Sequence, residues 1–274
     1  MTPYLSVVLP AYNEAKHIES NVLQVIDALS ADGLSFEVIV VDDGSPDHTH
    51  VAAIKAKARH PEVVRVVRYD KNKGKGNALI CGASYAKGSV VAFLDADMDL
   101  HPAQLLPMLK TMDRENIDVV IGSKRHPESD VDYPRHRWVL SSVYFMFIRM
   151  LFGLPLRDTQ TGIKIYRRSV VESVFPRVLA KRFAFDIEVL AIAHSFGFSI
   201  IDAPISLRFG RSFSRIKSLD VYQTLCDTLA IFYRLRITRY YQRQKVALGP
   251  EHPAALGSRE VHAQDGEFVG RLND

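Results

Sequence analysis

The stretch Val90–Asp99 constrains the fold most strongly, because five consecutive apolar residues run directly into three carboxylates at alternating positions. An apolar run of this length between turn-forming residues is typical of a strand buried in a parallel sheet. Ligands of open α/β sheets bind beyond the carboxyl ends of the strands. We therefore expect Asp95, Asp97 and Asp99 to lie near one another at a binding edge.

Carboxylates that are crowded at one edge repel one another unless a cation neutralises their charge. Hard divalent cations with oxygen ligands, Mg²⁺ or Mn²⁺, suit such a site and commonly carry substrate phosphates as well. We predict a metal site formed by Asp95, Asp97 and Asp99. A solvated acidic loop or the start of a helix is the alternative interpretation of the same residues.

Strand-like and helix-like patterns alternate through the first half of the chain. Strand patterns cover residues 4–9, 36–41, 63–68, 90–94 and 117–121. Between the first two, apolar residues recur at helical spacing at Ile18, Val22, Val25 and Leu29. This alternation predicts an α/β fold with a mostly parallel, doubly wound sheet that carries helices on both faces.

Four of these strands end in polar clusters, and their coincidence is the main functional signal. The clusters are PAYNE (10–14), VDDGS (41–45), NKGKG (72–76) and DADMD (95–99). No G-x-G-x-x-G follows the first strand, and Gly76 stands where a P-loop requires Ser or Thr. We therefore expect a nucleotide to be bound by another scheme, with acidic residues at the ribose and base, and lysine and metal at the diphosphate.

The placement of charge is more informative than the formal net charge, which is only +4. Between Arg208 and Lys245, nine basic residues are opposed only by Asp220 and Asp227. Such a region suits phosphorylated ligands, anionic lipid or nucleic acid. We expect no nucleic-acid partner, because aromatic residues do not interleave with the basic ones in a recognisable module. The two cysteines form no disulfide framework, which favours a reducing compartment.

The ordered set of motifs resembles the family 2 glycosyltransferases of the GT-A (Rossmann-like) fold. The second half narrows the resemblance through Asp158-Thr159-Gln160-x-Gly162-x-Lys164 and Phe185-Asp186-x-Glu188. These segments are similar to the polyprenyl- and dolichyl-phosphate sugar synthases, first to the glucosyl type and then to the mannosyl type. The resemblance covers about residues 4–237.

The resemblance implies a set of nucleotide-sugar-binding residues, which are Pro10, Ala11, Tyr12, Glu14, Asp42, Asp43, Lys75, Asp95, Ala96, Arg208 and Lys217. Asp43 would contact the base, and Asp42 would support the end of the strand. Asp95 and Asp97 would hold the diphosphate through the metal. For Lys75, a phosphate contact and a solvated lysine at a helix start both remain open.

On the acceptor side, the resemblance implies that Arg125, Arg135 and Arg137 bind the lipid phosphate, for which the guanidinium fork is suited. A solvated basic loop is the alternative. Asp158 would orient these arginines or the acceptor, although the role of general base remains open. The expected catalytic set is therefore Asp97, Arg125, Arg137 and Asp158.

The segment Trp138–Leu156 is strongly apolar but follows a basic loop and contains Arg149. Its residues 138–153 are interpreted as an amphipathic helix at the membrane interface, with a core helix as the alternative. The expected organisation is a catalytic domain over 1–215, an amphipathic helix over 216–243 and a disordered tail over 244–274. No segment carries eighteen uninterrupted apolar residues, so no transmembrane helix is assured.

Together these features predict a metal-dependent, inverting hexosyltransferase that acts on polyprenyl or dolichyl phosphate. UDP-glucose is the first expected donor and GDP-mannose the second. The protein is expected to be cytoplasmic and peripheral on the cytoplasmic face of a membrane, with a membrane protein or a second copy as further partner. A family 2 transferase acting on a soluble glycan, or a non-catalytic module that binds sugar nucleotides, are the alternatives.

Overall fold

The structure is a computed structural model that describes residues 2–131, 135–182, 184–207, 218–244 and 259–260. For residues 135–141, 218–221 and 259 only the backbone is described. The chain divides into two units. The first consists of Met1–Met98 with Leu248–Asp274, and the second of Asp99–Ala247.

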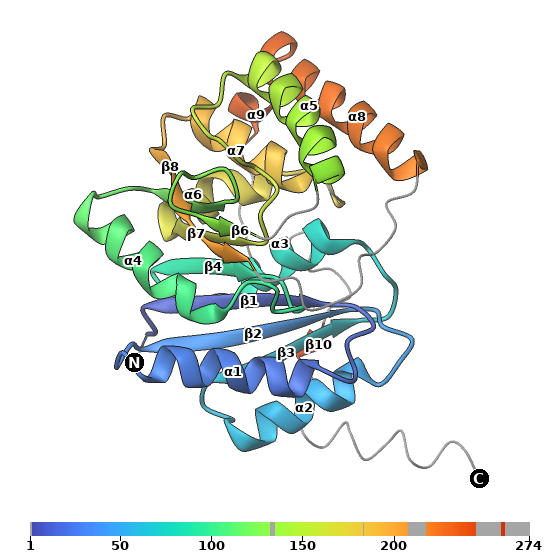
Figure 1. The fold of residues 1–274 in the computed structure, drawn as a ribbon. Helices are drawn as coiled ribbons and strands as arrows, with labels where there is room; N and C mark the ends of the chain where they lie inside the picture. The colour runs from blue at the N-terminus through green and yellow to red at the C-terminus, as the bar shows by residue number, and fades with distance from the viewer. Residues whose placement is uncertain (1, 132–134, 183, 208–217, 245–258, 261–274) are drawn as a thin grey trace. The chain divides into compact units, whose positions relative to one another are not determined.

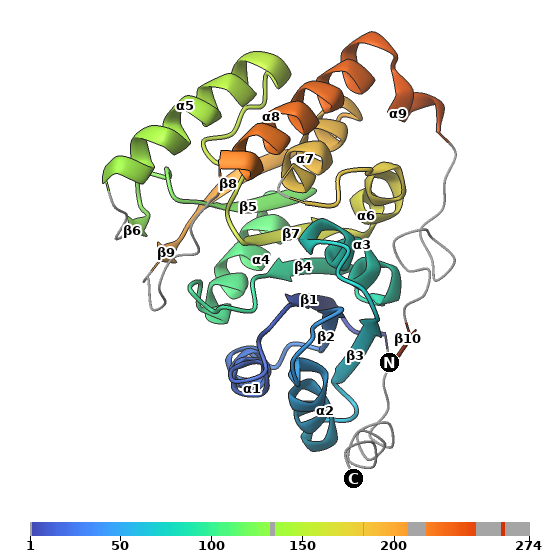
Figure 2. The same ribbon diagram turned by 90° about the vertical axis from the view of Figure 1, so that its right-hand side faces the viewer.

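The first unit alternates strands and helices as expected (Figure 1). Its elements are β1 (Leu5–Ala11), α1 (Ile18–Ser30), β2 (Phe36–Asp43), α2 (Thr49–Arg59), β3 (Val64–Tyr69), α3 (Lys75–Tyr85), β4 (Val90–Leu94) and β10 (Arg259–Glu260). Strands β3, β2, β1 and β4 pair in this order and all run parallel. Helices α1 and α2 lie on one face of these strands and α3 on the other (Figure 2).

The register of the parallel strands brings their carboxyl ends to one edge. Ala11, the last residue of β1, lies opposite Asp42, and Asp43 lies opposite Tyr69 at the end of β3. The interior of β2, Val38–Val41, is completely buried, as expected for a strand covered on both faces. The polar clusters of this unit therefore gather at the same edge, as predicted.

The second unit is mixed. Its elements are a 3₁₀ turn (Pro102–Gln104), α4 (Leu105–Arg114), β5 (Val119–Ser123), β6 (Asp130–Val131), α5 (Arg135–Phe152), β7 (Ile163–Arg167), α6 (Arg168–Val174), a 3₁₀ turn (Phe175–Arg177), α7 (Phe185–Ser195), β8 (Ile200–Pro204), β9 (Ser206–Leu207), α8 (Ser218–Phe232), a π-helical turn (Tyr233–Ile237) and α9 (Tyr240–Arg243). Strand β5 pairs antiparallel with β7 and parallel with β8. The prediction of an α/β fold with a mostly parallel sheet is thus confirmed, with β7 and β10 as antiparallel members.

Helices α5 and α8 of the second unit pack side by side. The Tyr144 hydroxyl lies 3.0 Å from Thr228 Oγ1, and the rings of Phe152 and Phe232 meet edge to face. In the part of the chain that the structure describes, no helix is long and apolar enough to cross a membrane.

Two boundaries differ from those expected. The helix predicted over 216–243 is divided, because α8 ends at Phe232, where a π-helical turn begins, and Arg239 then adopts a left-handed conformation with φ of 49°. The tail predicted as disordered contains β10, which pairs antiparallel with β3. Glu260 in this strand lies 3.5 Å from Lys57 Nζ and 3.7 Å from Arg65 Nε, so charge complementarity accompanies the backbone pairing.

Gly82 allows α3 to lie directly on the sheet, because a Cβ atom added there would be 2.3 Å from Val8 Cγ1. We expect Gly82→Ala to lower the free energy of unfolding by about 1–3 kcal/mol through overpacking. Urea denaturation measures this change. Lys55→Ala on the exposed side of α2 is the control, with an expected change within about 0.5 kcal/mol. Equal stability of Gly82→Ala and the wild type would contradict this packing.

Candidate functional site

The strand-end cluster comprises the polar residues of the first unit at 10–14, 42–47, 72–75 and 95–97. Its best-anchored member is Asp43 at the end of β2, which is almost fully buried. Asp43 Oδ1 accepts a hydrogen bond from Lys73 N at 2.8 Å, and Oδ2 accepts one from Gly74 N at 3.0 Å. Asp43 thereby fixes the loop that precedes α3, and its predicted contact with a base stays a prediction.

Gly44, the next residue, brings the same loop close to β2. Its φ of +63° lies in the left-handed region that glycine tolerates. A Cβ atom at this position would lie 2.5 Å from the carbonyl carbon of Lys71 and 2.6 Å from Asn72 N. Both the conformation and the space therefore require glycine here.

Asp42 is buried and supports the strand end, as expected. Its Oδ1 accepts a hydrogen bond from Ser45 N at 3.0 Å, and its Oδ2 lies 3.6 Å from Arg68 Nε. Burial raises the pKa of the Asp42 carboxyl above its ordinary value, although the Ser45 hydrogen bonds and Arg68 oppose the shift. The Asp42 side chain is fully buried, and its predicted place in the nucleotide-sugar site stays a prediction.

Three backbone amides, two of the PAYNE segment and one of the residue after it, join this segment to residues 45–49. Asn13 N donates to Ser45 Oγ at 3.1 Å, and Glu14 N donates to Thr49 Oγ1 at 2.9 Å. Ala15 N donates to Asp47 Oδ2 at 3.3 Å. The segment follows Pro10 and Ala11 at the end of β1, and the Tyr12 side chain is exposed.

The carboxylates of DADMD lie on a turn. Met98 N donates a hydrogen bond to the Asp95 carbonyl at 3.3 Å, and Met98 has a left-handed φ of 57°. Asn21 Nδ2, on α1, donates a hydrogen bond to the Ala96 carbonyl at 2.5 Å. Asp95 Oδ1 forms an ion pair with Lys75 Nζ at 2.5 Å, and both side chains are partly exposed. The predicted phosphate-binding lysine is thus held beside the first carboxylate.

The three-carboxylate metal site stays a prediction. Among the described residues, no three His, Cys, Asp or Glu side chains gather into a group that could hold a metal ion. The prediction assumed that strand alternation continues through Asp99, but β4 ends at Leu94 and Met98 has a left-handed backbone conformation. Asp95 and Asp97 therefore share the turn, while Asp99 begins the second unit.

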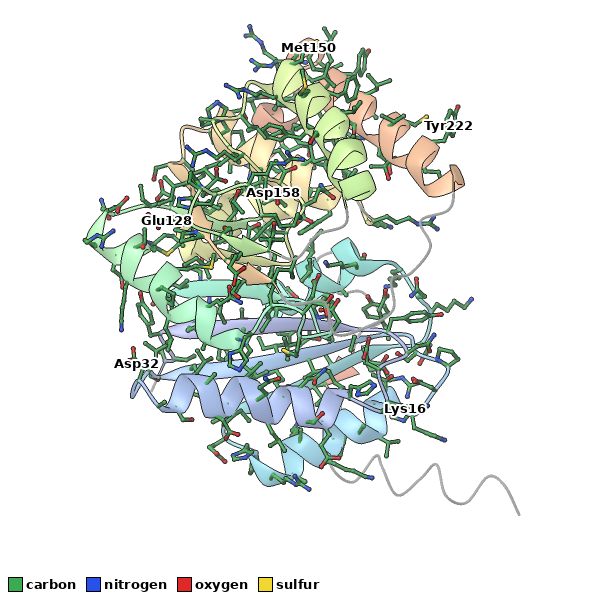
Figure 3. All side chains as sticks on the ribbon, viewed as in Figure 1. Lys16, Asp32, Glu128, Met150, Asp158 and Tyr222 are labelled. Carbon is green, nitrogen blue, oxygen red and sulfur yellow. The ribbon has the colours of Figure 1, made fainter. Side chains whose placement is uncertain are left out.

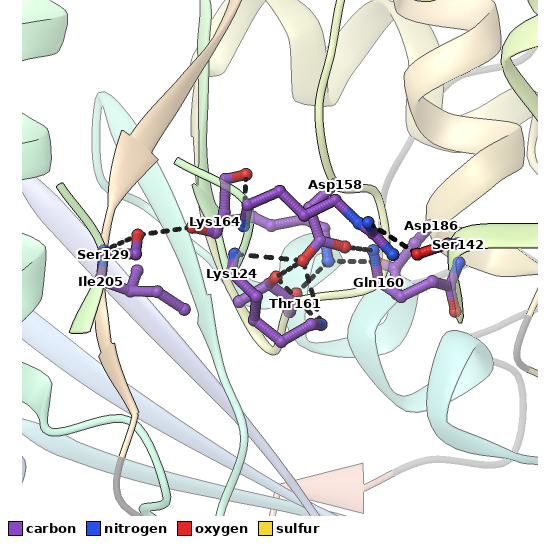
Figure 4. A network of polar contacts seen from close by, with 11 residues as sticks. Lys124, Ser129, Ser142, Asp158, Gln160, Thr161, Lys164, Asp186 and Ile205 are labelled. Carbon is purple, nitrogen blue, oxygen red and sulfur yellow. Dashed lines mark hydrogen bonds and ion pairs between the residues drawn. The ribbon is translucent and has the colours of Figure 1, made fainter. Parts of the chain in front are cut away.

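The Asp158 network lies in the second unit and comprises Lys124, Asp158, Thr161, Lys164 and Asp186 (Figure 4). Asp158 Oδ2 accepts hydrogen bonds from Lys124 N and Thr161 Oγ1, at 3.2 and 2.9 Å, and lies 3.0 Å from Lys124 Nζ. Gln160 N donates to Oδ1 at 3.0 Å. Lys164 Nζ donates to the Thr161 carbonyl and pairs with Asp186 Oδ1 at 2.9 Å.

This environment favours an orienting role for Asp158. Burial raises its pKa, but Lys124 and the donated hydrogen bonds outweigh burial, so the pKa lies below its ordinary value of 3.8. A carboxylate with a lowered pKa and four donors is a poor general base at neutral pH. The choice between an orienting role and a general base stays a prediction.

The two basic residues after β5 have different partners. Lys124 points into the network, whereas Arg125 Nη1 donates to Ser142 Oγ on α5 at 3.0 Å. The Arg125 guanidinium also lies 5.2 Å from the centre of the Phe145 ring. Arg125 therefore connects the end of β5 to α5, whose first turn contains Arg135 and Arg137.

Several predicted residues cannot be placed. Arg208 and Lys217 lie outside the described residues, and the side chains of Arg135 and Arg137 are not among those described. Conversely, sequence analysis assigned no role to Lys164 or Asp186. Both occur in the motifs that carried the family resemblance, but their pairing is visible only in the structure.

Comparison with known proteins identifies a family whose match covers both the strand-end cluster and Asp158. Residues 6–175 match the family described as glycosyl transferase family 2. A dolichyl-phosphate beta-glucosyltransferase from Dictyostelium discoideum is 28% identical over 217 residues, 74% of this chain and 66% of the relative. A dolichol-phosphate mannosyltransferase from Pyrococcus furiosus is 34% identical over 175 residues, 62% of this chain and 48% of the relative. The chain thus spans about half to two thirds of these relatives.

A solved structure shares the fold. Glucosyl-3-phosphoglycerate synthase from Mycobacterium tuberculosis, crystallised with Mn²⁺, UDP-glucose and phosphoglyceric acid, superposes with a TM-score of 0.61 at 26% identity. The match covers 84% of this chain and 80% of the synthase.

Replacement of Asp158 tests the network. We expect Asp158→Asn to lower the free energy of unfolding at neutral pH by about 3–5 kcal/mol, because Lys124 is left largely buried without its carboxylate. Since the folded pKa lies below 3.8, the stabilisation is complete above that value and is lost as the pH falls through the folded pKa. The difference between variant and wild type, measured by urea denaturation, should therefore shrink in acid.

Asp113→Asn is the control for this change, since the Asp113 carboxylate pairs with Arg167 at the surface and is half exposed. Its effect should stay within about 1 kcal/mol. A loss of stability in Asp158→Asn that is independent of pH would contradict the assignment of a paired, ionised carboxylate.

Proposed function

The chain belongs to the family 2 glycosyltransferases, and from this premise we propose that it transfers a hexose from a nucleoside diphosphate sugar to a polyprenyl or dolichyl phosphate with inversion. The single observation that carries the proposal is the strand-end cluster, which presents Asp95, Asp97 and Lys75 at the carboxyl edge of a parallel sheet. The names of the two relatives support a lipid phosphate acceptor. The bound UDP-glucose of the synthase supports UDP-glucose as the first donor, with GDP-mannose second.

Asp95 and Asp97 fit a divalent cation. Their carboxylates are the hard oxygen ligands that Mg²⁺ and Mn²⁺ prefer, and two carboxylates completed by substrate phosphates are a common arrangement for Mg²⁺. The Asp95 side chain is 30% exposed, and Asn21 and Met98 fix the turn that carries it. Such a cation would neutralise the charge of the departing diphosphate.

The protein's own residues then supply binding and orientation. Asp43 and Gly44 hold the loop before α3, and Lys75 is placed to contact the diphosphate. Pro10, Ala11, Tyr12 and Glu14 would surround the nucleoside, and Arg208 and Lys217 would add positive charge at the diphosphate.

The acceptor needs orientation more than deprotonation. A phosphate monoester has a second pKa of about 6 and is largely dianionic at neutral pH. Arg125, with Arg135 and Arg137 from the first turn of α5, would attract the anion and aim its oxygen at the sugar carbon. The orienting role of Asp158 agrees with this chemistry, because an acceptor hydroxyl would need a base and an ionised phosphate does not.

The exposed apolar residues of α5, α8 and the following π-helical turn support a membrane surface as partner. This apolar stripe consists of Val143, Met146, Met150, Tyr222, Leu225, Leu229, Tyr233 and Ile237. Met146 and Met150 are 69% and 74% exposed, and Figure 3 shows Met150 and Tyr222 on the outer side of their helices, with Asp158 further in. Exposed apolar faces of paired helices suit the headgroup boundary of a bilayer, here on its cytoplasmic side.

Transfer assays test the function. Radiolabelled UDP-glucose, GDP-mannose and UDP-N-acetylglucosamine would each be incubated with short polyprenyl phosphate, the matching polyprenol or 3-phosphoglycerate. We expect label from UDP-glucose to become extractable into organic solvent only with polyprenyl phosphate. Asp97→Asn should lower turnover at least about 100-fold, because a lost contribution of several kcal/mol to the barrier has that effect.

Asp70→Asn, an exposed carboxylate just after β3, is the matched control and should retain turnover. Near-full activity of Asp97→Asn in the presence of EDTA would contradict the metal site. Efficient transfer to polyprenol or to a soluble acceptor would contradict the lipid phosphate acceptor.

The apolar stripe has its own test. Met146→Ser with Met150→Ser should reduce co-sedimentation with vesicles of anionic phospholipid and leave the melting temperature unchanged, since both side chains are exposed. Ile148→Ser, which replaces a side chain only 1% exposed on the same helix, should instead lower the melting temperature. Unchanged vesicle binding combined with a shift from dimer to monomer in the double variant would identify the stripe as a contact between copies.

A further inference from the structure

Glu188 is an ionisable residue that the proposed chemistry does not use. It lies on α7 in the second unit, two residues after Asp186, and it is completely buried. A carboxylate in such a place is tolerated only when other groups donate hydrogen bonds to it or pair with its charge. The partners of Glu188 therefore indicate which segments it holds together.

The two oxygens of Glu188 serve different segments. Oε2 accepts hydrogen bonds from Leu179 N at 2.8 Å and from Ala180 N at 2.6 Å, in the connection that leads into α7. Oε1 accepts from Arg234 Nη2 at 3.1 Å and from the Tyr241 hydroxyl, both beyond the end of α8. One side chain thus ties the start of α7 to the C-terminal helices.

The C-terminal side of this contact contains three further hydrogen bonds. Arg234 Nε donates to the Tyr241 hydroxyl at 2.8 Å. Arg177 Nε donates to the Tyr241 carbonyl at 3.0 Å, and its Nη2 donates to the Gln244 carbonyl at 2.6 Å. Tyr241 is fully buried, and burial and the nearby Glu188 raise its pKa, so that its hydroxyl remains a donor.

The backbone of this segment departs from a regular helix where the contact requires it. The π-helical turn at Tyr233–Ile237 contains Arg234, and the left-handed Arg239 precedes α9. A continuous helix would carry Tyr241 further along the axis of α8. The irregular turn instead returns it to the Arg234 side chain and to Glu188.

The contact joins two regions with different proposed roles. Upstream, the connection at 179–180 leads to Asp186 of the Asp158 network. Downstream, α8 and its π-helical turn carry most of the apolar stripe. We infer that Glu188 is a positioning residue that fixes α8 relative to the Asp158 network. The protein thereby holds the apolar chain of its acceptor at a fixed position relative to the phosphate of the same acceptor. This inference rests on the proposed function.

Tyr241→Phe tests it with the smallest change, because the variant keeps the ring and loses only the hydroxyl that donates to Glu188. Tyr240→Phe removes the hydroxyl of the neighbouring residue and is the matched control. KM and kcat would be measured with a long polyprenyl phosphate in detergent and with a short, water-soluble prenyl phosphate. We expect Tyr241→Phe to raise KM for the long acceptor about tenfold, as expected for the loss of one hydrogen bond to a charged group.

KM for the short acceptor and for the nucleotide sugar should stay unchanged, and Tyr240→Phe should behave as the wild type. Equal losses with both acceptors, or no loss with either, would overturn the inference. Glu188→Gln is the second variant, and it should produce the same split between acceptors.

Hydrogen exchange separates this inference from the proposed function. In Tyr241→Phe, the amides of residues 233–244 should exchange faster while those of α7 keep the wild-type rate. If the wild type transfers sugar to no prenyl phosphate, the proposed function fails, and the inference about the acceptor fails with it even where exchange shows the contact. If the wild type is active and exchange in 233–244 is unchanged, only the inference fails.

Discussion

Buried carboxylates that accept hydrogen bonds from backbone amides are the interaction on which the arrangement of the loops depends in both units. Asp43 binds the amides of Lys73 and Gly74, and Glu188 binds those of Leu179 and Ala180. Asp158 accepts from the amides of Lys124 and Gln160. An amide in a buried loop requires an acceptor, and an ionised oxygen gives a stronger hydrogen bond than a neutral one.

The carboxylates of this protein therefore fall into two groups. One group is buried and stabilises loops, and the other is exposed and can bind ligands. Asp43, Asp158 and Glu188 are buried and accept hydrogen bonds from several donors, so they hold neighbouring segments in place. Asp95, in contrast, lies on a turn, is partly exposed and is paired with a lysine that is more exposed still. A divalent cation and a phosphorylated ligand can reach such a pair without breaking the scaffold that holds it.

The sequence predicted those strands and helices that are determined by the pattern of neighbouring residues. Strands β1 to β4 were found because a strand buried on both faces has a continuous apolar run, and the edge that gathers the polar clusters followed from their parallel order. Strand alternation does not extend to the predicted ligand Asp99, because β4 ends at Leu94 and Met98 adopts a left-handed conformation, and the metal site itself stays a prediction. The end of α8 was missed because the contact of Arg234 with Glu188 joins residues far apart in the chain. Lys164 and Asp186 occur in the motifs that carried the resemblance, but only the fold pairs them.

The strand β10 makes the first unit discontinuous in sequence, since the unit is formed by both ends of the chain. The second unit is, in these terms, an insertion between two parts of the first. A chimera in which residues 1–98 come from a relative would therefore have to take the residues of β10 from that relative as well. Otherwise the β3 of the relative would have to pair with the β10 of this chain. For this protein the natural piece to exchange is the middle of the chain, which contains the Asp158 network and the apolar stripe together.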